Sequence, residues 1–285
     1  MENTSESNDA LLSIAVVVPC YNYGRYLSEC LNSILAQSVM PGRVIVIDDA
    51  SNDSTFEIAQ DYAAAYASLE VRRNPIRMGL SSVRNMGAEM THSEFLCFID
   101  ADDTIPENYL DECLKALCDS RAGYAYPSAH YTGSEHGFAI AQAFDRPLLY
   151  RRNFVLSSAL IRRGTIDTIG GWSTALERLG VEDWQFWFKA LHAGIDGVPA
   201  ASTWLNYRRH VSGGASVSGT SARHYLASRH ALRTSMGSEG TRILPWKYAI
   251  VALLRIGAPE LFRRIKRRVI KPLEGFLCPV PGCRE

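Results

Sequence analysis

The chain has 285 residues, 30 basic and 30 acidic side chains, and a hydrophobic fraction of 47%. This composition is ordinary for a globular protein, and the length allows one large α/β domain, alone or with an appendage. A formal net charge of zero gives no support for a nucleic-acid partner, and no window reaches the ~20 apolar residues that a membrane-spanning helix needs.

The cysteines and the N-terminal residues indicate a cellular compartment. Seven cysteines are scattered along the chain, and several, such as Cys30 and Cys113, lie in apolar helical patterns. The first ten residues are polar and acidic and lack the apolar stretch of a secretory signal. We therefore expect a reducing, cytoplasmic location with buried thiols. Cys278 and Cys283 lack a second pair of ligands, so a metal site there is the less favoured interpretation.

Four short runs of residues in the first 120 predict β-strands. Three are apolar, at residues 14–19, 44–47 and 95–99, and the other is LEVRR at residues 69–73. Each run is followed by apolar residues at helical spacing, which predicts helices within residues 27–35, 56–66, 83–90 and 110–117. Strands that alternate with helices are typical of a mostly parallel, Rossmann-like α/β sheet that is covered by helices on both faces.

This alternation ends after residue 118. Short strands and turns are predicted from residue 124, with further strands at residues 157–163 and 203–209 and a helix that contains Trp184, Trp187 and Leu191. Residues 212–219 read as a flexible loop, and the chain is expected to be helical from residue 221 onward. The predicted organisation is a disordered tail (1–12), an α/β domain (13–215) and a helical, basic C-terminal segment (216–285).

The fourth predicted strand leads directly into a cluster of carboxylates, in the sequence FLCFIDADD at residues 95–103. In an extended chain, Asp100 and Asp102 would point to the same side. Two such carboxylates suit a hard divalent cation such as Mg²⁺ or Mn²⁺, which would also neutralise the cluster. The alternative is that these residues only begin a turn and cap a helix. Asp103 is interpreted as a turn residue.

Common nucleotide-binding motifs are missing from the sequence. The first strand is followed by YNYGRY and not by G-x-G-x-x-G, and no G-x-x-x-x-G-K-[ST] occurs. Dinucleotide and P-loop interpretations therefore lose their main support. Tyr21 and Tyr23 could offer an aromatic face to a base, and the alternative is that one of them is a core residue and the other is exposed.

Several motifs resemble those of the family 2 glycosyltransferases, which have the GT-A fold. They lie, in the family's order, in VVVPCYNYGRYLSECLNSILAQS, VIVIDDASNDST and NPIRMGLSSVRNMGAEMTHSEFLCFIDADD. The resemblance continues through GGW, ERLGVEDWQFWFKA and NYRRHVSGGAS, and so covers about residues 13–215. It implies a nucleotide-sugar-binding half (13–120) and an acceptor half (121–215), and leaves the last seventy or so residues outside.

The resemblance also implies a reaction and roles for particular residues. A sugar would pass with inversion from a nucleotide sugar, usually UDP-linked, to a hydroxyl group, with Mn²⁺ or Mg²⁺ as cofactor. By position, Asp183 would be the general base, and Asp102 and His210 would bind the metal. The residues implied for the nucleotide-sugar site are Pro19, Tyr21, Asn22, Asp49, Arg84, Asn85, Asp100, Glu182 and His210.

The chemistry fits these implied roles, although each residue also has a structural alternative. A cation stabilises charge on the leaving diphosphate, and a carboxylate at a helix N-terminus stays ionised and can take the proton of the acceptor hydroxyl. Alternatively, Asp183 is a helix cap, His210 a surface or core histidine, and Arg84 the partner of an acidic neighbour. Trp172, after a Gly-Gly turn, is a candidate for stacking on the acceptor sugar, whereas Trp187 is expected in the core.

The C-terminal segment mixes apolar residues with a basic block at residues 260–271. One interpretation is an interfacial helix on the anionic inner face of the cytoplasmic membrane, where a lipid-linked saccharide acceptor would be available. The other is the solvated face of a packing helix. No RNA-binding motif accompanies the block, so RNA binding is disfavoured.

The sequence suggests three alternative functions. The favoured one is an inverting, metal-dependent glycosyltransferase of surface polysaccharide or glycolipid assembly in the cell envelope. A nucleotidyltransferase that forms the nucleotide sugar would need a Gly-rich loop with Lys or Arg, which is missing, and would not need the Glu182–Asp183 pair. An inactive nucleotide-sugar-binding module is disfavoured because every acidic position expected for catalysis is present.

Overall fold

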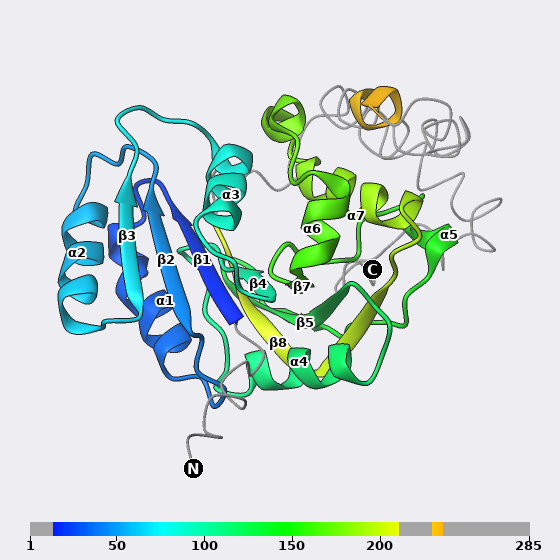
Figure 1. Cartoon of the computed structure of the whole chain (residues 1–285), viewed down its shortest axis with the longest axis horizontal. Coiled ribbons are helices and arrows are strands. Elements are labelled where there is room, and N and C mark those ends of the chain that lie inside the picture. Colours follow the sequence, from blue (N-terminus) through cyan, green and yellow to red (C-terminus); the bar gives the residue numbers. More distant parts are fainter. Residues whose placement is uncertain (1–13, 211–229, 236–285) are drawn as a thin grey trace, which may run out of the picture.

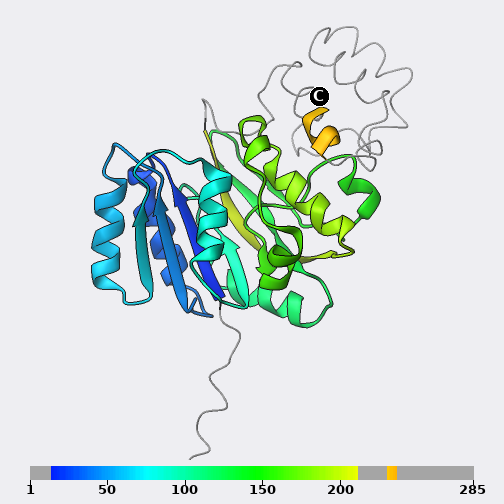
Figure 2. The same ribbon diagram turned by 45° about the horizontal axis from the view of Figure 1, so that its top comes forward.

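A computed structural model of the chain describes residues 14–210 and 230–235. They build one eight-stranded sheet in the order β3-β2-β1-β4-β7-β5-β6, with β8 paired to β5. Helices lie on both sides of this sheet (Figures 1 and 2). The predicted N-terminal tail, the loop at 212–219, the basic block at 260–271, and Cys278 and Cys283 lie outside the described residues.

The first half of the sheet has the predicted alternation of strands and helices. Strands β1 (Ile14–Cys20), β2 (Arg43–Asp48), β3 (Leu69–Arg73) and β4 (Phe95–Phe98) are parallel, and β1 pairs with both β2 and β4. They are followed in turn by α1 (Gly24–Leu35), α2 (Thr55–Ala65), α3 (Leu80–Glu89) and α4 (Tyr109–Cys118). The expectation of a mostly parallel sheet in this half is confirmed.

The second half extends the sheet with antiparallel pairs. Strand β7 (Leu160–Arg162) is antiparallel to both β4 and β5 (Tyr124–Gly133), and β6 (Gly137–Ala139) is antiparallel to β5. Strand β8 (Gly197–Arg209) begins earlier than the sequence predicted and runs parallel to β5. The remaining elements are α5 (Arg146–Leu149), α6 (Arg163–Ile169), the 3₁₀ helix η1 (Thr174–Leu179) and α7 (Glu182–His192).

The core has one hydrophobic layer on each face of the sheet. Side chains of α1, α2 and α4 pack on one face with Val16 and Val18, and side chains of α3, α6 and α7 pack on the other with Val17. A parallel strand that is covered on both faces needs apolar residues at every position, which explains why β1 is buried throughout.

Four of the five cysteines in the described part of the chain are buried, and all five are free thiols. Burial raises the pKa of Cys20, Cys30, Cys97 and Cys113. The expectation of buried thiols is confirmed for these four, whereas Cys118 is exposed. No helix within residues 14–210 and 230–235 has the length and apolar character to cross a membrane.

Candidate active site

The candidate site lies at the carboxyl edge of the parallel strands, where open α/β sheets bind their ligands. Pro19 is buried at the end of β1 and pairs with Ile47 of β2. Asn22, which has a φ of 58°, accepts a hydrogen bond from Asn52 N at 2.9 Å, and its own N–H donates to Ser51 Oγ at 2.9 Å. These bonds join the loop after β1 to the loop after β2.

The two tyrosines of the first loop differ in their surroundings. The guanidinium of Arg77 lies 4.0 Å from the centre of the half-buried Tyr21 ring. Tyr23 precedes α1 and packs beside Tyr26 and His210, with ring centres 6.3 and 6.4 Å away. Tyr21 therefore stacks on a cation, and Tyr23 belongs to an aromatic group beside His210.

Asp49 fixes the loop that follows β3. Its side chain is buried and accepts hydrogen bonds from Asn74 Nδ2, Met78 N and Gly79 N, each at 2.8 Å. An open cavity of about 500 Å³ is lined by Ala50, Arg73, Asn74 and Pro75. Asn74 thus connects Asp49 to a cavity at the carboxyl ends of β2 and β3.

The carboxylates after β4 lie on a turn. Asp103 N donates to Asp100 O at 3.0 Å, so the extended backbone expected from the sequence was wrong for Asp100 and Asp102. Asp103 is buried and accepts a hydrogen bond from Arg208 N at 2.8 Å. The turn is therefore anchored to the end of β8.

The same end of β8 brings His210 to Asp102. His210 Nε2 lies 2.7 Å from Asp102 Oδ2, across 108 residues of sequence. Burial and the charge of Asp100 raise the pKa of Asp102, and His210 opposes that rise. A carboxylate and an imidazole therefore face each other at the edge where the parallel strands end.

Arg84 of α3 joins two acidic segments from distant parts of the chain. Its Nη2 lies 3.1 Å from Asp100 Oδ1, and its Nη1 lies 3.6 Å from Glu182 Oε1. The residue is only 2% exposed. Burial opposes the charge on Arg84, but Asp100 and Glu182 outweigh it and raise its pKa. Arg84 Nε and Glu182 Oε2 are buried without a hydrogen-bond partner, which leaves them able to bind a polar ligand group.

Glu182 and Asp183 form the first turn of α7, as the sequence predicted. Burial and the neighbouring Asp183 raise the pKa of Glu182 to about 7, although Arg84 opposes the rise. Burial also raises the pKa of Asp183, against the effect of Arg84. Adjacent carboxyl groups with perturbed pKa values are typical of catalytic sites.

Asn153, which sequence analysis did not single out, contacts Asp183 directly. Its Nδ2 donates to Asp183 Oδ2 at 2.9 Å, and Trp184 N donates to Asp183 Oδ1 at 2.7 Å. Asn153 lies in the irregular segment between α5 and β7, outside every recognised motif. No sequence signal marked it, because its role depends on how that segment packs against α7.

Asn85 and Trp172 do not have the surroundings that the sequence suggested. The amide of Asn85 bonds to the backbone of Trp172, with Nδ2 donating to O at 2.9 Å and Oδ1 accepting from N at 2.8 Å. Trp172 is 3% exposed, and its ring packs on Phe186 and Phe98. The prediction of Trp172 as an acceptor-stacking residue was wrong, whereas Trp187 is a core residue as expected.

The donor atoms at Asp102 and His210 suit a divalent cation that has further ligands from elsewhere. Within the described residues, no three acidic, histidine or cysteine side chains are grouped so that they could hold a metal ion. Carboxylate oxygen and imidazole nitrogen are accepted by Mn²⁺, and Mg²⁺ prefers oxygen and keeps several waters. Two protein ligands fit a cation that is completed by phosphate oxygens and water.

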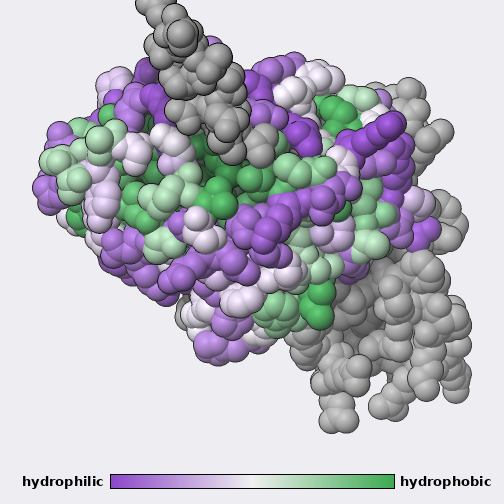
Figure 3. Space-filling view, turned by 60° about the horizontal axis from the view of Figure 1, so that its bottom comes forward, coloured by the Kyte–Doolittle hydropathy of each residue, from purple (hydrophilic) through white to green (hydrophobic). Residues whose placement is uncertain are grey.

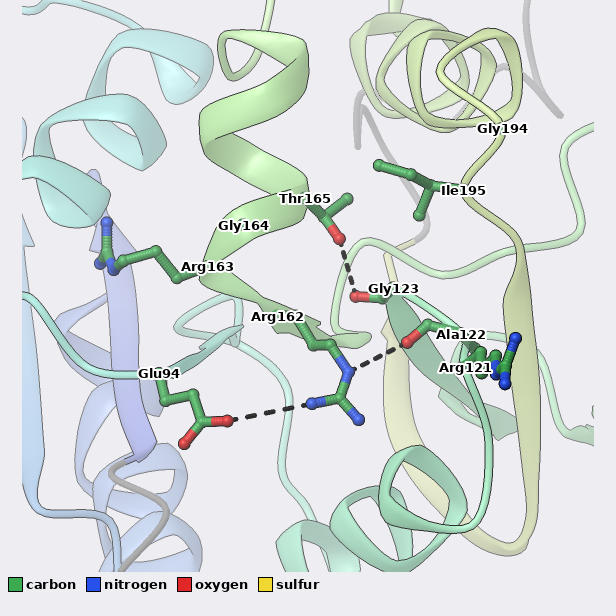
Figure 4. A pocket seen from close by; sticks show the side chains of 10 residues that line it. All are labelled: Glu94, Arg121, Ala122, Gly123, Arg162, Arg163, Gly164, Thr165, Gly194 and Ile195. Atoms are coloured by element: carbon green, nitrogen blue, oxygen red, sulfur yellow. Dashed lines mark hydrogen bonds and ion pairs between the residues drawn. The ribbon is translucent and has the colours of Figure 1, made fainter. Parts of the chain in front are cut away.

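A second pocket, of about 390 Å³, lies at the opposite edge of the sheet, near the amino ends of β4, β5 and β8 (Figure 4). Two of its arginines, Arg162 and Arg163, are engaged by the protein itself. Arg162 donates to Ala122 O and Leu117 O, and Arg163 donates to Ser93 O and Ala88 O. This pocket is not part of the candidate active site.

The side of the molecule turned forward in Figure 3 mixes hydrophilic and apolar residues.

Sequence comparison relates the chain to named glycosyltransferases. It is 34% identical over 98 residues to glycosyltransferase GlyG of Streptococcus pneumoniae, which is 34% of this chain and 33% of that protein. It is 24% identical over 181 residues to glycosyltransferase AglE of Haloferax volcanii, which is 60% of this chain and 59% of that protein. The chain thus spans a third to three-fifths of the length of these relatives.

Structural comparison and the family model agree. The fold is similar to that of Staphylococcus aureus TarS residues 1–349, crystallised with UDP-GlcNAc, with a TM-score of 0.66 and 17% identity over 90% of this chain and 75% of that chain. That likeness confirms the predicted GT-A fold. The model of glycosyl transferase family 2 matches residues 15–174, more than half of the sequence. The chain therefore belongs to glycosyl transferase family 2.

Proposed function

We propose that this glycosyltransferase is an inverting, metal-dependent enzyme that moves a sugar from a UDP-linked donor to a hydroxyl group of a saccharide or lipid-linked saccharide. The observation that carries the proposal is the convergence of two carboxylate pairs on Arg84. Asp100 and Asp102 follow β4, Glu182 and Asp183 begin α7, and Arg84 contacts one member of each pair.

This convergence suits displacement at a sugar carbon. The acceptor oxygen attacks the anomeric carbon, the bond from that carbon to the diphosphate oxygen breaks, and Asp183 takes the hydroxyl proton. A single base on the face opposite the leaving group produces inversion. Arg84, and Glu182 through its unpartnered oxygen, would bind donor groups near that carbon.

A bound Mn²⁺ or Mg²⁺ would stabilise the negative charge of the leaving diphosphate. Asp102 and His210 would hold the cation, because their facing oxygen and nitrogen lie 2.7 Å apart at the carboxyl edge of the sheet. Asp100 belongs to the donor site through its contact with Arg84.

The nucleotide would lie at the ends of β1 and β2. Pro19, Tyr21 and Asn22 are proposed to line its pocket, and the cavity beside Asn74 offers space for the base. Asp49 would hold the wall of that cavity, and its Oδ2 retains one lone pair for the base. The choice of UDP is supported by the related fold of TarS, which was crystallised with UDP-GlcNAc and with UDP.

The family resemblance implied that Asn85 binds the nucleotide sugar. We propose instead that Asn85 has a structural role. Both atoms of its amide are bound to the backbone of Trp172, so Asn85 holds α3, and with it Arg84, against the second half of the domain.

The biological setting is proposed from the relatives. One of them is a putative teichuronic acid biosynthesis glycosyltransferase, TuaG of Bacillus subtilis, which is 26% identical over 113 residues. Assembly of a cell-surface polysaccharide or glycolipid at the cytoplasmic side of the membrane is consistent with this. A membrane contact through residues 260–271 would place the enzyme beside a lipid-linked acceptor.

The test is calorimetric titration of UDP into the purified protein with Mn²⁺ or with EDTA, for the wild type and Asp102→Asn. We expect binding with Mn²⁺, at least tenfold weaker binding in EDTA, and no metal dependence in the variant. Asp111→Asn, at a partly exposed position of α4, is the control and should bind as the wild type does. If UDP fails to bind with either metal while GDP or dTDP binds, the UDP donor is wrong. If none of the three binds, the donor site is wrong.

A further inference from the structure

We propose that Asn153 is a positioning residue that holds the carboxylate of Asp183 in one orientation for proton transfer. The inference rests on the proposed function, because it takes Asp183 as the general base. Asn153 lies outside the family's motifs, on the irregular segment between α5 and β7. It acts on the reaction only through its 2.9 Å hydrogen bond to Asp183 Oδ2.

The orientation of the Asn153 amide is fixed by a second hydrogen bond. Val155 N donates to Asn153 Oδ1 at 3.2 Å, so the oxygen of the amide faces its own backbone. The NH₂ group must then face Asp183, because a flipped amide would place an oxygen against the carboxylate and an NH₂ group against a backbone N–H. Asn153 can therefore only donate to Asp183.

The segment that carries Asn153 is tied to the helix that carries Asp183. Trp184 Nε1 donates to Leu149 O at 2.8 Å, and Trp187 Nε1 donates to Val155 O at 3.2 Å. Both indoles belong to α7, and their partners lie on either side of Asn153 in the sequence. The amide and the carboxylate are thus held at a fixed separation by two bonds from the helix itself, which is the arrangement that a preorganised catalytic group needs.

The electrostatic surroundings explain why Asp183 needs this donor. Glu182 on its own helix and Asp100 after β4 are its acidic neighbours, Arg84 of α3 is the positive group, and the site is buried. Burial and nearby carboxylates favour the protonated form, which cannot act as a base. A hydrogen bond donated to the carboxylate favours the ionised form. Each oxygen of Asp183 accepts one such bond, which leaves a lone pair on each for the acceptor's proton.

Two substitutions of Asn153 distinguish a role as hydrogen-bond donor to Asp183 from a role in folding the segment between α5 and β7. Asn153→Ala loses both hydrogen bonds of the side chain. Asn153→Asp keeps the acceptor for Val155 N but places a second carboxylate against Asp183. A role in folding the segment would therefore be preserved in Asn153→Asp, whereas a role as donor to Asp183 would be lost in both variants. Gln142→Ala is the control, because Gln142 accepts a hydrogen bond from Arg152 in the same segment.

The measurement is the pH profile of kcat/KM for sugar transfer, together with the KM for the donor. We expect the acidic limb to move to higher pH by roughly one unit in Asn153→Ala and further in Asn153→Asp, because the lost donor and the added charge raise the pKa of the base. On the acidic limb, kcat should fall about tenfold in Asn153→Ala, with recovery at alkaline pH and little change in the donor KM. Gln142→Ala should keep the wild-type profile.

The proposal is overturned if Asn153→Asp has the wild-type profile, or if both variants lose activity equally at every pH. The pKa of Asp183, followed by ¹³C NMR of carboxyl-labelled aspartate and assigned with Asp183→Asn, tests the contact without catalysis. A higher pKa in Asn153→Ala supports the contact even if no sugar is transferred, and an unchanged pKa refutes it. Failure of the wild type to transfer sugar, or full activity of Asp183→Asn, would instead refute the proposed function.

Discussion

Asn85 and Trp172 are joined by two hydrogen bonds, of 2.9 and 2.8 Å, across 87 residues of sequence. The pair connects α3, next to Arg84, with the Gly170–Gly171 turn that precedes η1. Gly171 has a φ of 70°, and a Cβ atom there would lie 2.4 Å from Asn85 Oδ1. Only glycine permits this approach, so the Gly-Gly-Trp sequence serves to dock one half of the domain onto the other.

Asn85→Ala is expected to lower the free energy of unfolding by about 2 kcal/mol, because two buried backbone groups of Trp172 lose their partner. The dissociation constant for UDP should change by less than about threefold. Urea unfolding and calorimetric titration measure the two quantities. Gln60→Ala on the exposed side of α2 is the control and should change neither. A variant with wild-type stability but much weaker UDP binding would mean that Asn85 turns toward the donor.

Arg84→Met is expected to lower the free energy of unfolding by about 3 kcal/mol or more at pH 8, because it leaves Asp100 and Glu182 without their buried positive partner. The loss should be smaller at pH 5, where Glu182 is protonated. Adding Glu182→Gln to Arg84→Met should restore part of the stability at pH 8, since one uncompensated charge is removed. Urea unfolding of the four proteins in this cycle measures the coupling. Simple additivity at both pH values would contradict the ion pair.

Glu182 predicts a pH dependence of stability. Its folded-state pKa of about 7 lies above its usual value of 4.5, so its stabilising contribution is present below pH 4.5 and is lost as the pH rises through 7. Between pH 5 and pH 8, the free energy of unfolding should therefore fall by about 2 kcal/mol less in Glu182→Gln than in the wild type.

Urea unfolding at several pH values tests this slope. Glu112→Gln is a control of opposite sign, because hydrogen bonds from Ser202 and Lys115 lower the pKa of Glu112, below the tested range. It should leave the slope between pH 5 and pH 8 unchanged. Equal slopes for the wild type and Glu182→Gln would show that Glu182 is already ionised in the folded protein at pH 5.

The sequence by itself determined the alternation of strands and helices and the edge at which the site lies. A parallel strand buried on both faces requires an uninterrupted apolar run, and polar residues that directly follow such runs lie at the carboxyl edge of the sheet. Pro19, Asp49, Asp100 and Asp102 were placed in this way. The Glu182–Asp183 pair was marked by its motif, and its position in the first turn of α7 was predicted from the apolar spacing of that helix.

Only the tertiary structure decided which side chains meet. The contacts of Asp183 with Asn153, of Trp172 with Asn85 and of Asp102 with His210 span 30, 87 and 108 residues. Local patterns cannot predict such contacts, because they depend on the path of the chain between the partners. The turn after β4 and the burial of Trp172 departed from expectation for the same reason. A hydrogen bond from β8 fixes the turn, and packing on Phe98 helps to bury Trp172, and both partners are distant in sequence.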